Sequence, residues 1–247
     1  MLFSRKFAGT LFLGGGIAFT LGSLLYPSML GVQKVSSAPE RIIGHPATGP
    51  LTEADRDFVV EVRAAGLWEY PVGQMAMQKS TTKAVKTAGE HLIAGHASLD
   101  AACRGVAGEL DIALPNQPSP QQQGFVTQLN AESGKQFDTD MATILRATQG
   151  QILSKTASVR TTTKNSLIRA LADRTNDILM EHITLVEKTG LVDFDRALSQ
   201  PTGLPAQDTT PPPPVAGQPQ AVLPSPDDGT LSPGSTGAAS AEAGRTS

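Results

Sequence analysis

Four polar side chains occupy positions that the apolar pattern assigns to the inner sides of helices. They are Glu69, His96, Gln149 and His182. His96 is the clearest case, because it stands between Leu92 and Leu99 in a run of mostly apolar residues spaced by three and four. Gln149 lies at the edge of its stripe. Carboxylate and imidazole groups inside a helical bundle are typical metal ligands, so chemistry is expected here first.

Two interpretations of these four residues remain open. In the first, they form a buried polar cluster in which a protonated histidine balances the Glu69 carboxylate. In the second, Glu69, His96 and His182 hold one divalent, zinc-like metal ion, with Gln149 or water as the fourth ligand. We favour the buried polar cluster, with no resident cofactor, and keep the metal site as the alternative.

No motif in the sequence indicates catalysis. Dinuclear iron sites in bundles use Glu-x-x-His pairs, but the residues three before the two histidines are Ile93 and Leu179. A nucleophile elbow, a glycine-rich phosphate loop and a Cys-x-x-Cys pair are also missing from the sequence. The single cysteine, Cys103, lies on the apolar stripe and is expected to be a small buried side chain. We therefore predict that the protein is not an enzyme.

Apolar periodicity and capping residues predict the helices that position the polar group. Thr52 begins the first helix, which contains Pro71 and a kink before it. Ser80 or Thr81 caps the second. The expected long helices cover about 52–79, 81–111, 135–161 and 165–188, with a short extra helix at 121–132. The sequence predicts an all-α fold, an up-and-down four-helix bundle over 52–192 in which no strand is expected.

In such a bundle the four polar residues fall at similar depth. They lie between about 11 and 19 residues from the turns near Ser80 and Thr163, which corresponds to a spread of roughly 12 Å along the axis. Long side chains close part of that difference. One polar layer across the bundle is therefore expected.

The two ends of the chain differ from this middle. Arg5 and Lys6 precede an uncharged apolar stretch at 7–32, which predicts a signal peptide or a retained membrane anchor within residues 1–32. Residues 33–51 are expected to be a linker. Residues 193–247 are rich in proline, glycine and serine, and we predict a disordered tail because they bury too little apolar surface.

Several short segments resemble the DUF4142 family. They are Gly-Leu-Trp-Glu at 66–69, the run from Val85 to His96 that leads to Leu114-Pro115, Phe137-Asp138 and Glu181-His182. The resemblance covers roughly 52–190 and is nearest to actinobacterial members. It implies a ferritin-like helical bundle of unknown function in exported bacterial proteins. The chain differs at Thr148-Gln149, where many members carry Asp-His.

These observations lead to one functional expectation. The domain is expected on the extracytoplasmic side of the cell membrane, held by residues 7–32, or secreted if that segment is cleaved. There it would act as an interaction or structural module toward envelope proteins or cell-wall components. Nucleic acid is excluded as a partner, because the net charge is −3 and aromatic residues make up only 4% of the chain.

Overall fold

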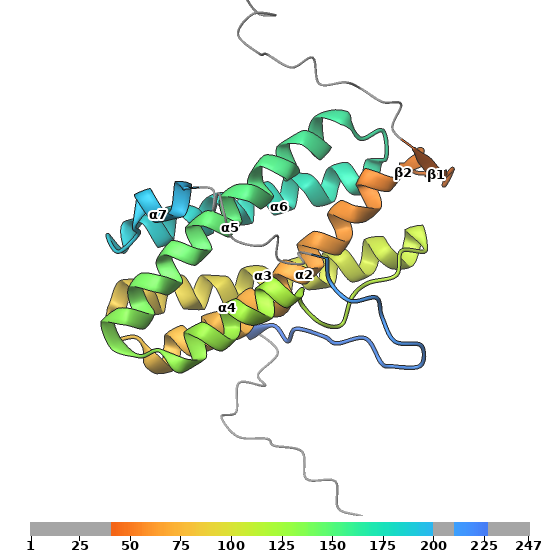
Figure 1. Ribbon diagram of the computed structural model, residues 1–247. Coiled ribbons are helices and arrows are strands. Elements are labelled where there is room, and N and C mark those ends of the chain that lie inside the picture. Colours follow the sequence, from red (N-terminus) through yellow and green to blue (C-terminus); the bar gives the residue numbers. More distant parts are fainter. Residues whose placement is uncertain (1–40, 200–209, 227–247) are drawn as a thin grey trace, which may run out of the picture. The chain divides into compact units, whose positions relative to one another are not determined.

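A computed structural model describes residues 41–199 and 210–226, and helices make up most of them (Figure 1). The all-α fold class predicted from the sequence is confirmed at this level. The elements in chain order are β1 (Ile42–Gly44), β2 (Leu51–Thr52), α2 (Glu53–Lys79), α3 (Lys83–Leu110), α4 (Pro120–Ala131), α5 (Gly134–Thr162), α6 (Ser166–Lys188) and α7 (Phe194–Leu198).

Side-chain caps fix where the helices begin. Thr52 and Ser119 each form a capping box, so the first free backbone N–H groups of α2 and α4 are satisfied locally. Asn165 caps α6 through the N–H groups of two residues. The cap of α3 is Thr82, whose side chain accepts from the Val85 N–H. It lies one residue later than Thr81, the later of the two expected caps. Pro71 lies inside α2.

The four long helices pack as neighbouring pairs. α2 lies along α3 and α5 lies along α6, while α3 contacts α6 and α2 contacts α5 (Figure 1). α4 lies in the connection between α3 and α5 and packs on α2, where the Trp68 and Phe125 rings meet at 5.5 Å. Each long helix therefore turns one side toward the others, as its apolar stripe predicts.

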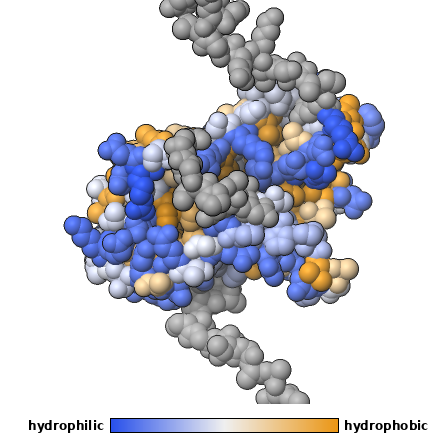
Figure 2. Space-filling model, viewed as in Figure 1, coloured by the Kyte–Doolittle hydropathy of each residue, from blue (hydrophilic) through white to orange (hydrophobic). Residues whose placement is uncertain are grey.

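Most of the apolar core of the described residues falls into two clusters along the helices, and a third, small cluster contains Tyr70, Ile93 and Ala97. The first contains Phe58 and Val62 of α2 and Leu99 of α3, and the second contains Val72 of α2 and Leu92 of α3. On α3, His96 lies between Leu92 of the second cluster and Leu99 of the first. On the face shown in Figure 2, hydrophobic patches are small and scattered, which agrees with apolar sides that face inward.

The expected linker at 33–51 needs correction in its described part. β1 and β2 pair in antiparallel fashion, Ile42 opposite Thr52, so the expectation that the chain has no strand is also wrong. The turn between them is tied to the start of α6, because the Asn165 side chain donates to the Gly49 carbonyl at 2.9 Å. Local hydrogen bonds order this segment in spite of its prolines and glycines.

The expected disordered tail also differs from the structure over its described residues. Asp193 caps the short helix α7, and its own backbone N–H donates to Thr143 of α5. Residues 210–226 turn back on themselves near Gly217 and then run as an extended stretch whose main chain contacts α2 and α3 (blue in Figure 1). Composition correctly indicated little apolar surface here, but hydrogen bonds from buried side chains order the stretch instead.

The predicted signal or anchor segment, residues 7–32, lies outside the described residues. Among the helices that the structure does describe, none has the length and apolar character that a bilayer crossing requires.

We predict that Cys103 is unreactive in the folded protein. Its side chain is fully buried in the first apolar cluster, and burial raises the pKa of the thiol to about 12, so almost no thiolate exists at neutral pH. Labelling by a chromogenic disulfide reagent at pH 8 should be at least about 1000-fold slower than in denaturant. Fast labelling of the native chain would show that the cluster around Cys103 opens.

Candidate metal centre

The candidate centre takes one polar side chain from each long helix. Glu69 comes from α2, His96 from α3, Gln149 from α5 and His182 from α6, and all four are at most 2% exposed. Along each long helix, the polar residue stands at or next to the point where residues of the first apolar cluster give way to residues of the second. The structure thus brings together all four residues singled out in the sequence.

The Glu69 carboxylate is the hub of the centre. Its Oε2 accepts hydrogen bonds from His96 Nε2 at 3.0 Å and from Gln149 Nε2 at 2.6 Å. Its Oε1 is buried and has no hydrogen-bond partner within the described part of the chain. A buried carboxylate is stable only if both oxygens have hydrogen-bond donors or a cation nearby, because each unsatisfied oxygen costs free energy of folding.

His182 is held by a backbone carbonyl. Its Nε2 lies 3.0 Å from the carbonyl oxygen of His91 in α3, and a carbonyl only accepts, so Nε2 carries the hydrogen. The ring fits against α3 because the nearest position is Gly95. A Cβ there would lie only 2.5 Å from His182 Nε2.

The electrostatics of the centre keep His182 neutral. Burial is the main cause that lowers its pKa to about 3, and the positive charge available to His96 lowers it further, against the opposing effect of the His91 carbonyl. At neutral pH, Nδ1 of His182 therefore carries a lone pair. This nitrogen is buried and without a hydrogen-bond partner among the described residues.

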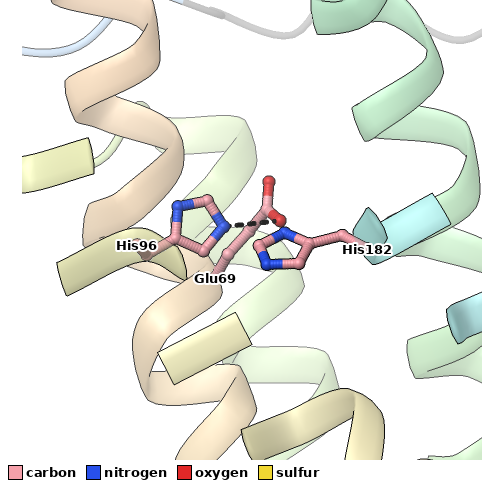
Figure 3. Close-up of side chains that lie close together, drawn as sticks. All are labelled: Glu69, His96 and His182. Atoms are coloured by element: carbon pink, nitrogen blue, oxygen red, sulfur yellow. Dashed lines mark hydrogen bonds and ion pairs between the residues drawn. The ribbon is translucent and has the colours of Figure 1, made fainter. Parts of the chain in front are cut away.

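The three ionisable side chains converge on one point. In Figure 3 the imidazoles of His96 and His182 face the Glu69 carboxylate from two sides, and the two rings lie 5.2 Å apart between centroids. One ligand atom from each of Glu69, His96 and His182 lies within 4.8 Å of the other two. Small inward shifts of these atoms would bring them to the spacing of ligands around one small cation.

Sequence reasoning missed the groups that orient the centre. The carbonyl of His91 and the missing side chain of Gly95 fix His182, but a backbone atom and a glycine carry no polar signal in a helical pattern. The side chain of His91 is elsewhere, in a surface pair with Glu181 at 2.7 Å. Gly95, directly before His96, was the one sequence feature that could have indicated a close approach of another side chain to α3.

A second buried charge pair was also missed. Arg63 of α2 and Asp100 of α3 form an ion pair whose side chains are almost fully buried. Asp100 also accepts from Arg104 at 3.0 Å, and Arg63 donates to the Pro115 carbonyl at 3.3 Å. Burial lowers the pKa of Arg63 to about 10, which leaves the guanidinium charged at neutral pH.

Taken together, the fold and the centre define a class of helical protein with one buried Glu/His group across its four long helices. Comparison with protein families agrees, since residues 43–189 match the family described as "Domain of unknown function (DUF4142)". The chain belongs to the DUF4142 family. Neither curated proteins nor solved structures gave a match to the chain.

We predict that the Glu69→Ala substitution destabilises the metal-free fold by about 3–5 kcal/mol, because it leaves buried donors of His96 and Gln149 without an acceptor. The matched control is Glu181→Ala, which removes the exposed carboxylate of the other Glu–His pair and should cost less than about 1 kcal/mol.

Chemical denaturation with a chelator present measures both variants, since bound metal would otherwise add to the stability. Equal midpoints for Glu69→Ala and the parent chain would contradict a buried network around this carboxylate.

Proposed function

We propose that this domain binds one divalent transition-metal ion through Glu69, His96 and His182. The observation that carries the proposal is the orientation of His182. Its Nε2–H is used by the His91 carbonyl, so the lone pair of Nδ1 is turned toward the Glu69 carboxylate (Figure 3).

Two electron-rich groups that face each other in a dry interior repel. A proton on His182 Nδ1 would relieve the repulsion, but burial holds the pKa of this ring near 3. A metal cation between the two groups relieves it without protonating the ring. For this reason the geometry now favours the metal site over the self-contained polar cluster that the sequence alone favoured.

The ligand set suits a zinc-like ion. Two imidazoles and one carboxylate are ligands for Zn²⁺ and its first-row neighbours. Three atoms within 4.8 Å of one another have a centre at most about 2.8 Å from each, so inward shifts of about 0.7 Å reach ordinary metal–ligand distances. The buried Oε1 of Gln149 is unpartnered among the described residues and offers a fourth ligand, with water as the alternative.

The protein's own groups prepare His182 for binding. A carbonyl that accepts from one imidazole nitrogen fixes the ring and leaves the other nitrogen free, which is the usual support for a metal-bound histidine. His96 differs, because its Nε2 carries the hydrogen that it donates to Glu69. Binding through Nε2 therefore requires His96 to give up or relocate that proton.

The wider setting follows from the sequence. We propose that the four long helices form an up-and-down, ferritin-like bundle, and that residues 7–32 export the domain and hold it at the membrane. A metal-binding domain placed there would meet ions outside the cytoplasm. Contacts with envelope components, which the sequence also suggested, are compatible with this role but add nothing to the argument for metal.

We predict that the metal-stripped chain binds about one Zn²⁺ or Co²⁺ per molecule, and that His182→Ala weakens binding by at least about 100-fold, because a ligand is lost. His91→Ala is the matched control, since it removes an imidazole but keeps the carbonyl that supports His182. Calorimetric titration, with elemental analysis of the product, measures both.

Circular dichroism establishes that the variants keep the parent fold. Absence of a stoichiometric ion in the parent chain, or undiminished binding in His182→Ala, would refute the metal site. The buried polar cluster would then be the remaining interpretation.

A further inference from the structure

An extended stretch of the chain is held on α2 and α3 through its main chain. Asn116 accepts from the Ala221 N–H at 3.1 Å, and Arg63 donates to the Ala221 carbonyl at 2.6 Å. Asp100 accepts from the Leu223 N–H at 3.1 Å, and Tyr70 donates to the Pro224 carbonyl at 3.0 Å. Asn116 also donates to the Pro219 carbonyl at 3.3 Å. These contacts recognise an extended backbone from Pro219 to Pro224.

Two of the side chains that make these contacts are buried and fixed by each other. Arg63 and Asp100 are nearly inaccessible to solvent, and a buried ion pair carries a desolvation cost that a tightly packed apolar pair would avoid. Arg63 Nη2 donates to a carbonyl of this stretch, and Asp100 Oδ2, which also accepts from Arg104, accepts from one of its N–H groups. The pair thus recognises two successive peptide groups, one on each side of Val222, which a chance surface contact does not require.

Side chains add specificity to the backbone contacts. Leu223 packs against the small apolar cluster of Tyr70, Ile93 and Ala97, whereas its neighbour Val222 is 56% exposed. This alternation is that of an extended strand with one side on the domain. The preferred ligand is therefore an extended peptide with a leucine at the position of Leu223.

We propose that Arg63, Tyr70, Asp100 and Asn116 form a peptide-binding site whose resident ligand is residues 219–224 of the same chain. We call these four residues the peptide site. The resident segment is held by hydrogen bonds and one leucine, so it exchanges with the solvent more readily than the core does.

The resident segment also covers the side of the metal centre, an inference that rests on the function proposed above. Gly66 of α2 separates Leu223 from His96: a Cβ there would lie 3.2 Å from Leu223 Cδ1 and 3.6 Å from His96 Nδ1. That ring nitrogen is buried and lacks a hydrogen-bond partner among the described residues.

Covering His96 Nδ1 has a chemical consequence. Metal binding through Nε2 requires the hydrogen on Nδ1, and a hydrogen there needs an acceptor such as water. Leu223 supplies none. Departure of the segment would admit water to Nδ1 and favour the tautomer that binds metal, so occupancy of the peptide site slows metal uptake.

The test substitutes two adjacent residues of the full chain. Leu223→Asp places a charge in the apolar contact and should release the segment, whereas Val222→Asp places the same charge on an exposed position and should not. Hydrogen exchange of the Ala221 amide is the first readout. We expect at least about tenfold faster exchange in Leu223→Asp and little change in Val222→Asp.

A synthetic peptide of residues 216–226 is the second readout. It should bind the Leu223→Asp chain, whose site is vacated, and bind the parent chain at least about tenfold more weakly, because there the resident segment competes. Equal exchange in both variants, equal peptide binding by both chains, or no binding at millimolar peptide would overturn the proposal. Protection that depends on protein concentration would also overturn it, since the ligand would then be the tail of a second copy.

Uptake of Zn²⁺ by the metal-stripped chain is the third readout and is separable from the other two. Leu223→Asp should take up Zn²⁺ at least about tenfold faster than Val222→Asp. If the parent chain binds no metal, exchange and peptide binding still decide the peptide site. If metal binds but uptake is equally fast in both variants, the covering role is wrong and the metal site stands.

Discussion

The structure depends on one constraint, the burial of the Glu69 carboxylate between two apolar clusters. A charge in that position is tolerated only if donors or a cation surround it. Each of the other long helices contributes to this balance, His96 from α3, Gln149 from α5 and His182 from α6. The packing of the four long helices therefore determines which groups surround the carboxylate, and so determines the chemistry of the centre.

The balance is incomplete within the protein's own groups. Two donors reach the carboxylate, while the third neighbour, His182, presents a lone pair because its hydrogen is taken by the His91 carbonyl. A fold selected for stability alone would have used the opposite ring orientation, with a donor toward the carboxylate. The arrangement instead resembles a site in which the missing positive charge comes from a bound ion.

Helix α2 connects this centre to the peptide site. Arg63, Gly66 and Glu69 follow each other at intervals of three and lie near one side of the helix. Arg63 binds the main chain of the 219–224 segment, Gly66 admits Leu223 close to His96, and Glu69 is the hub of the proposed metal centre. The residues of α2 that belong to the two sites are thus less than two helical turns apart.

The sequence by itself determined the long helices, the cap at Thr52 and the four residues of the centre, because periodicity and capping are local properties of the chain. Only the tertiary structure decided what those residues do. The direction of the His182 ring depends on a backbone carbonyl and on Gly95 in another helix. The order of residues 210–226 depends on the Arg63–Asp100 pair, whose partners lie in different helices and far from that stretch in sequence. Such contacts leave no periodic signal, so composition alone indicated disorder.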